Sequence, residues 1–125
     1  MDRGDEAADV PVDSWTGLQQ AIDAYEEGQV IVVTQNLVCD NGLCISVKDG
    51  PVVIDLDGHV LDRDLGKSGS DGSVISVYGS GDLTVRDSKG AGIITGGWSV
   101  RNGGGICVSA GASCSIEGVT VSGNI

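Results

Sequence analysis

The sequence has few aromatic and few basic side chains. Its 125 residues include no Phe, two Trp and two Tyr, and 7 Lys and Arg stand against 18 Asp and Glu, for a net charge of −11. A surface of this sign repels nucleic-acid phosphates and anionic lipid. No apolar run approaches the roughly 20 residues that span a bilayer. We therefore expect neither a nucleic-acid partner nor membrane insertion.

Histidine is also scarce, because His59 is the only one. It lies in the stretch VVIDLDGHVLD (52–62) beside three carboxylates, Asp55, Asp57 and Asp62. Catalysis would need a second group aimed at the same reacting atom, and the sequence does not identify one. Asp57-Gly58 is a turn dipeptide, so we interpret His59 as a hydrogen-bonded turn residue that opens the next short strand. We assign no catalytic residue.

Glycine and β-branched residues are abundant, in contrast. The 21 Gly argue against a helical bundle, and the many Val and Ile argue against disorder. One helix is expected over 14–26, capped by Ser14 and ended by Gly28. Its apolar residues recur at helical spacing: Trp15, Leu18, Ile22 and Tyr25.

The later apolar segments form a repeat of about 31 residues. Segment 73–88 aligns with 104–119, so that Ile75 falls on Ile106 and Leu83 on Cys114. Segment 43–56 fits the same frame with one residue of difference, so that Ile45 falls on Val77. A third short strand follows in each unit, at 59–61, 92–95 and 119–122. Three short strands per unit, turned by Gly-rich corners, predict the coil of a parallel β-helix whose core is buried by stacking.

Five stretches carry a resemblance to a known family: SWTGLQQAIDAY, VIDLDGHVLD, GDLTVRDS, GGGICVSAGA and GVTVSGN. Their order resembles the start of a pectate-lyase-like right-handed parallel β-helix, in particular the Gly-rich β-helix regions of bacterial cell-surface, adhesin-type proteins. The fold class expected is thus all-β, a solenoid with an N-terminal capping α-helix. Residues 1–13 would be a flexible tail and 14–125 one domain, with the capping helix at 14–26. The coils would occupy 30–125 and be truncated at the C-terminal end.

The resemblance implies a non-catalytic structural or adhesive module of a secreted or cell-surface protein. The alternative is the N-terminal part of a carbohydrate-active enzyme, a polysaccharide lyase or hydrolase, or a glycan-binding domain, because the superfamily hosts all of these. The partners expected are a polysaccharide or a host or cell-surface glycan. Further coils or self-association would cover the C-terminal edge.

Candidate site residues follow from the same resemblance, since lyases of this superfamily bind Ca²⁺ with clustered carboxylates. The weak calcium candidates are Asp62, Asp64 and Asp71, although their loop lacks the spacing of a dedicated calcium motif. No other cofactor is expected. The candidate ligand-binding residues are Asp62, Arg63, Asp64, Trp98 and Arg101. Trp98 would stack on a sugar, or instead cover apolar surface.

Two further hypotheses concern polar columns. Asp55, Arg86 and Glu117 share one outward position in successive units, which predicts an exposed ladder of ion pairs. Cys39 and Cys44 flank a turn and are the candidates for a disulfide. In the repeat frame Cys44 shares an outward column with Cys107, whereas Cys114 points inward as a small apolar residue.

Overall fold

The computed structural model describes residues 9–65, 72–99 and 104–125. It has one short helix, α1, and strands that form two parallel sheets. The elements, in chain order, are β2 (Asp9–Val12), α1 (Trp15–Asp23), β3 (Val30–Val33), β4 (Leu37–Val38), β5 (Ile45–Asp55), β6 (Val60–Asp62), β7 (Ile75–Arg86), β8 (Gly92–Thr95), β9 (Ile106–Val108), β10 (Ser113–Glu117) and β11 (Val119–Val121).

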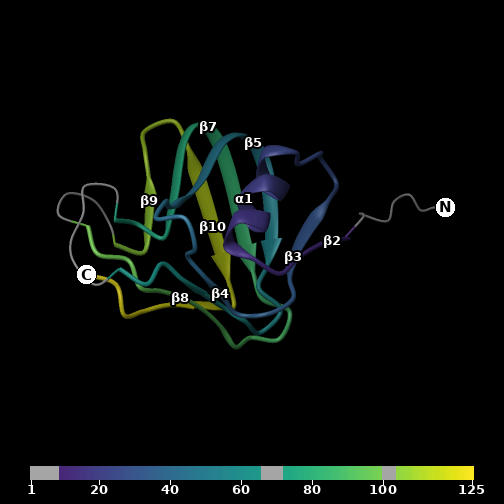
Figure 1. Cartoon of the computed structure of the whole chain (residues 1–125). Coiled ribbons are helices and arrows are strands. Elements are labelled where there is room, and N and C mark those ends of the chain that lie inside the picture. The colour runs from purple at the N-terminus through teal and green to yellow at the C-terminus, as the bar shows by residue number, and fades with distance from the viewer. Residues whose placement is uncertain (1–8, 66–71, 100–103) are drawn as a thin grey trace.

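The larger sheet has the order β10-β7-β5-β3-β2, with β9 also paired to β7, and the smaller has the order β11-β8-β6-β4. Every strand pairing is parallel. In Figure 1 the larger sheet stands upright and the strands of the smaller one run below it, with the N-terminus and the C-terminus at opposite ends. Successive strands therefore add layers from the N-terminal to the C-terminal side.

The predicted fold class, a right-handed β-helix with three short strands per coil, is wrong. The structure has two parallel sheets and one short helix, and these sheets do not form a solenoid. The expected first and second strands of a unit are one continuous strand, as in β5 and β7. The reason is local: Gly50 and Gly79 take positive φ, and the ladder continues past them instead of ending in a turn.

Part of the predicted alignment also needs correction. Ile75 pairs with Ile106, and Leu83 with Cys114, as expected. Ile45, expected opposite Val77, pairs with Ile75 instead, and the register shifts between Val47 and Asp49. The error is two residues, so it preserves which side chains face inward, because side chains alternate with a period of two.

The core lies between the sheets and under the helix. It is made of aliphatic side chains from successive layers, among them Ile31, Ile54, Leu56, Leu61 and Ile94, all fully buried. Burying each such side chain stabilises the fold by about 1.5–3 kcal/mol. This core fixes the inward face of every strand and hence the surface on which polar residues stand.

The helix covers one end of this core. Ser14 caps it by accepting a hydrogen bond from the Gly17 N–H, and the helix buries Trp15, Leu18 and Ile22. It packs against the first part of β5, because β3 pairs with β5 only near Ile54 and leaves that part without a strand on this side. This helix, Trp15–Asp23, is shorter than the capping helix that the sequence predicts over 14–26.

The N-terminal segment differs from the predicted tail of residues 1–13, whose first eight residues lie outside the described ranges. Residues 9–12 form β2, which pairs with β3 through Val10 and Ile31. Across the part of the chain that the structure describes, no helix combines the length and apolar character needed to cross a membrane.

Candidate functional site

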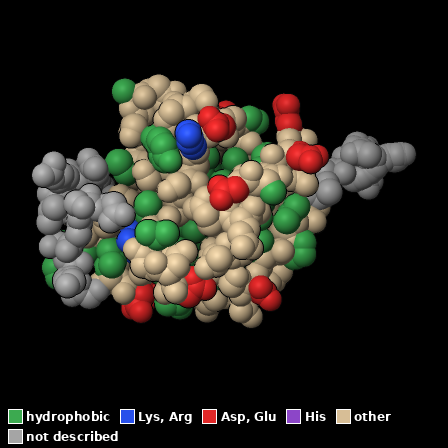
Figure 2. All heavy atoms as spheres, turned by 45° about the horizontal axis from the view of Figure 1, so that its top comes forward, with side chains coloured by type: hydrophobic (Ala, Val, Ile, Leu, Met, Phe, Trp, Pro, Cys, Tyr) green, Lys and Arg blue, Asp and Glu red, His purple; other side chains and the backbone are tan. Residues whose placement is uncertain are grey.

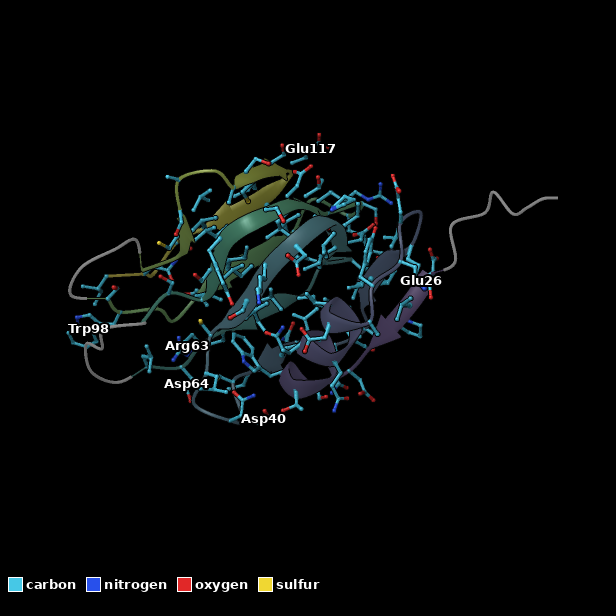
Figure 3. The ribbon with its side chains drawn as sticks, turned by 90° about the horizontal axis from the view of Figure 1, so that it is seen from above. Glu26, Asp40, Arg63, Asp64, Trp98 and Glu117 are labelled. Atoms are coloured by element: carbon cyan, nitrogen blue, oxygen red, sulfur yellow. The ribbon has the colours of Figure 1, made fainter. Side chains whose placement is uncertain are left out.

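The structure brings four of the predicted ligand-binding residues to one end of the molecule. Figure 3 shows Arg63, Asp64 and Trp98 on this side, with Glu117 at the far side of the larger sheet. The segment after β6 runs along the segment after β8, because the Arg63 N–H donates to the Thr95 carbonyl at 3.0 Å. Arg101 and Asp71 lie outside the described residues.

Arg63 is a structural residue rather than an exposed ligand-binding one. Its side chain is buried, with 3% of the residue exposed. The guanidinium donates to the carbonyl of Ser73 at 2.6 Å and to that of Gly42 at 2.9 Å. A charged donor shared between two carbonyls ties two loops to the end of β6. This arrangement leaves the Arg63 charge directed into the protein.

The carboxylates beside Arg63 also have local roles. Asp62 accepts a hydrogen bond from the Asp64 N–H at 2.8 Å, and Asp64 has a φ of 55°. Such a bond stabilises a tight turn. Among the described residues, no group of three or more His, Cys, Asp or Glu is placed to hold a metal ion. Asp62 and Asp64 therefore shape a loop, and Trp98 lies half-buried beside it.

The corner at Asp57, Gly58 and His59 agrees with the turn interpretation. Asp57 and Gly58 both have positive φ, and the His59 N–H donates to the Leu56 carbonyl at 2.9 Å. A ring nitrogen of His59 lies 3.2 Å from the same carbonyl. Asp57 also pairs with Lys89 at 3.3 Å. The polar residues of this stretch are thus occupied in a bend.

Asp55 faces Arg86 as predicted, with 3.6 Å between the Arg86 Nε and an Asp55 carboxylate oxygen. The pair was expected to be exposed, and this is wrong for Asp55. The Asp55 side chain is only 10% exposed. The reason is that the next layer's corner folds over it, and Ser88 donates its N–H to the Asp55 carboxylate at 3.1 Å. The hollow beside this pair, about 360 Å³, is bordered also by Glu117.

Asp87 is a buried acid that the sequence analysis missed. It accepts hydrogen bonds from the N–H groups of Gly58, Lys89 and Gly90, at 2.8–3.0 Å. Burial alone would raise the pKa of Asp87, but these backbone donors, together with that of Gly92, lower it below the ordinary value. In the repeat alignment, Asp87 takes the inward position that Leu56 has in the preceding layer. A polar residue at an inward position was the sequence feature that could have identified Asp87.

The four cysteines are free thiols, so the predicted Cys39–Cys44 disulfide is not formed in this structure. The Cys39 thiol instead contacts the Leu43 carbonyl at 3.5 Å, and the Cys44 sulfur lies 3.8 Å from the Ser46 hydroxyl. The predicted column of Cys44 with Cys107 is also wrong, because Ser46 occupies that position. Cys114 aligns with Leu83 as expected, and burial, with the charge of Asp82, raises the pKa of its thiol.

A groove beside α1 encloses about 430 Å³. The helix and the turn after it make one wall, with Asp23, Tyr25 and Glu27. Strands β5 and β7 make the other, with Lys48 and Tyr78. Its volume falls within the usual range for small-ligand sites.

The Gln19 side chain, which borders the groove, is held in place by two hydrogen bonds. Gln19 donates to the Ser46 carbonyl at 3.0 Å and accepts from the Ser46 N–H at 2.8 Å, as a neighbouring strand would. Gln19 and Ser46 also border a second hollow of about 250 Å³, next to Trp15 and Leu43. The two hollows share Asp23 as well, so they lie next to each other along the helix.

The chemistry of this groove combines aromatic rings with carboxylates. Tyr78 is 38% exposed, whereas Tyr25 is half-buried and donates its hydroxyl hydrogen to the Gln29 carbonyl. Burial raises the pKa of Tyr25, a hydrogen bond with the Val53 backbone lowers it, and the Glu27 charge adds to the rise. Tyr25 thus remains a neutral ring at physiological pH.

This groove is not evident from the sequence. Tyr25 belongs to the apolar series of the helix, and Tyr78 stands at an outward position of a strand, with nothing to indicate that the two line the same groove. They do so because β3 is short and the helix packs against the uncovered part of β5.

Comparison with protein-family models, curated proteins and solved structures finds no match. The resemblance to pectate-lyase-like proteins therefore stays a prediction, and the β-helix that it implied is not the fold that the two sheets form. The geometry of the chain itself has to support any function.

Proposed function

We propose that this chain is a non-catalytic structural and adhesive module of a secreted or cell-surface protein, and that it binds a glycan in the groove beside α1. The observation that carries the proposal is that Tyr25 and Tyr78 both line one groove of about 430 Å³. An aromatic face covers the C–H groups of a sugar ring, while its edge and its hydroxyl remain polar. The carboxylates and Lys48 supply hydrogen bonds for sugar hydroxyls.

The charge of the groove narrows the glycan class. Asp23, Glu27 and Asp49 border it, against Lys48. Figure 2 shows Asp and Glu side chains spread over the face of the molecule that it draws, with few Lys or Arg. An acidic groove in a protein of net charge −11 repels polymers of uronic acid. The glycan that it favours is neutral or carries amino sugars.

Binding measured with two matched variants tests the proposal. Titration of neutral and amino-sugar oligosaccharides into the protein should give saturable binding, and Tyr78→Ala should weaken it at least tenfold, the scale of losing one stacked ring. Trp98→Ala removes an aromatic from the end of the molecule that holds Arg63, and should leave affinity unchanged. Weaker binding in Trp98→Ala, with unchanged binding in Tyr78→Ala, would place the site at Trp98 instead. Release of unsaturated or reducing ends would show an enzyme and refute a non-catalytic role.

A further inference from the structure

Among the described residues, no strand covers the end of the two sheets that the last three strands form. β10 and β11 are the end strands of their sheets, and β9 pairs with β7. In the layer before, Val77, Val85 and Ile94 are fully buried. Their partners in the last layer are Val108, Ile116 and Val121, which are 44%, 41% and 42% exposed. Core positions thus reach solvent at this end.

This end also lacks the features that keep sheet edges apart. Glu117 is the only charged residue of β9, β10 and β11, and these strands contain no Pro. The edge strand at the other end, β2, carries Asp9 and Pro11. Charges and prolines are the usual protection of an exposed edge against strand addition.

The backbone of β10 offers hydrogen bonds at alternate residues. The Asp87 N–H donates to the Glu117 carbonyl at 3.1 Å, so the backbone groups of Glu117 face β7. Because these groups alternate in direction along a strand, those of Cys114 and Ile116 face the free edge.

We infer that a second copy of this chain covers this edge, with β10 antiparallel to its counterpart around a two-fold axis at Ser115. This register sets Cys114 opposite Ile116 of the second copy, as a hydrogen-bonded pair that uses the groups at the free edge. Inward side chains then meet inward side chains.

Charge selects the same register. With the axis at Ser115, Glu117 stands opposite Ser113 of the second copy, and no like charges meet. An axis at Glu117 would set the two carboxylates against each other, which destabilises a strand pair. An axis between two residues would place inward side chains opposite outward ones. The contact is isologous, so it closes at a dimer. This inference goes beyond glycan binding and does not depend on it.

Sedimentation velocity over a concentration series tests the dimer in the full chain. The unaltered protein should change from monomer to dimer and form nothing larger. Ile116→Lys buries a charge in the contact and should leave only monomer. Val38→Lys makes the same change at an exposed Val on β4, at the opposite end, and should dimerise like the parent.

A charge exchange tests the register and also covers the case in which Ile116→Lys fails to fold. Ser113→Glu sets two Glu pairs opposite each other and should weaken dimerisation about tenfold. Adding Glu117→Lys to that variant should restore it. A parent that stays monomeric or forms open-ended oligomers overturns the inference. Equal effects of Ile116→Lys and Val38→Lys, or no rescue in the double variant, do so as well.

Discussion

The buried carboxylate of Asp87 joins two corners of the fold. It replaces an apolar residue of the preceding layer and accepts hydrogen bonds from three backbone N–H groups of these corners. Hydrogen bonds to a charged acceptor contribute about 1.5–3 kcal/mol each to stability. The corner after β5 and the corner after β7 are therefore held together by one side chain.

We predict that Asp87 makes stability fall at low pH. Its folded-state pKa is lowered, so the carboxylate stabilises the fold above the ordinary value of 3.8, and this contribution is lost as pH falls through the folded-state pKa. Asp87→Asn should flatten this part of the pH profile and cost about 1–2 kcal/mol at neutral pH. Urea unfolding at several pH values measures both. Asp13→Asn, an exposed acid, is the control, and an equally steep profile in Asp87→Asn would contradict the assignment.

Arg63 should act on stability and not on binding. Arg63→Lys removes the planar fork that reaches the carbonyls of Ser73 and Gly42, so we expect a loss of about 2 kcal/mol in the free energy of unfolding. Glycan affinity should stay within twofold of the parent. Calorimetric unfolding and binding titration of the same preparation measure the two effects. A loss of affinity in a variant of unchanged stability would return Arg63 to the ligand site.

At the scale of elements, the helix substitutes for a missing strand. β3 pairs with β5 only near Ile54, and the Gln19 amide makes the two hydrogen bonds that a strand would make to Ser46. The same packing creates the groove. Function in this account depends on how one side chain holds α1 against β5.

We predict that Gln19→Leu loosens this contact. The substitution removes the two hydrogen bonds to Ser46, while leucine keeps the bulk and the helix propensity of glutamine. We therefore expect a loss of about 1–2 kcal/mol in the free energy of unfolding. Backbone amides of α1 should exchange faster with solvent, and glycan affinity should fall because the wall that carries Tyr25 moves. Gln20→Leu makes the same change at the neighbouring exposed position and is the control. Unchanged exchange in Gln19→Leu would show that the clamp is unimportant.

The helix and most strands could be predicted from the sequence. Which short strands merge into one longer strand could not. Alternating apolar residues identified β7, β8, β10 and β11, and Ser14 with its apolar series identified the helix. The sequence Asp49-Gly50-Pro51 is equally consistent with a turn and with a strand that continues past a positive-φ Gly. Only pairing with β7 decides for the continuous strand, whose register shift lies just before these residues, between Val47 and Asp49, and that pairing joins two of the three expected strands of a unit.

The candidate site was less predictable than the fold. Asp62, Arg63 and Asp64 have the composition of a ligand site, but their neighbours in space decide their roles, and those neighbours are backbone carbonyls and N–H groups. The groove joins a helix end to strands far along the chain. A single sequence carries no signal for that contact.

At the scale of the whole molecule, charge should decide which glycans bind. The protein has a net charge of −11, so uronic acid polymers are repelled at long range. We predict that neutral oligosaccharides bind with an affinity that hardly changes with ionic strength. Any binding of uronic polymers should be weaker and should strengthen as salt screens the repulsion. Titrations at low and high salt measure this, and tight binding of a uronic polymer at low salt would contradict the account.

The proposed function places the ligand in the groove beside α1. Chemical-shift mapping by nuclear magnetic resonance, with a saturating neutral glycan, locates the bound ligand on the protein. We expect the largest shifts on Gln19, Tyr25, Ser46 and Tyr78, with little change at residues 62–64 or at Trp98. Shifts centred on Arg63 and Trp98, with the groove unchanged, would contradict it.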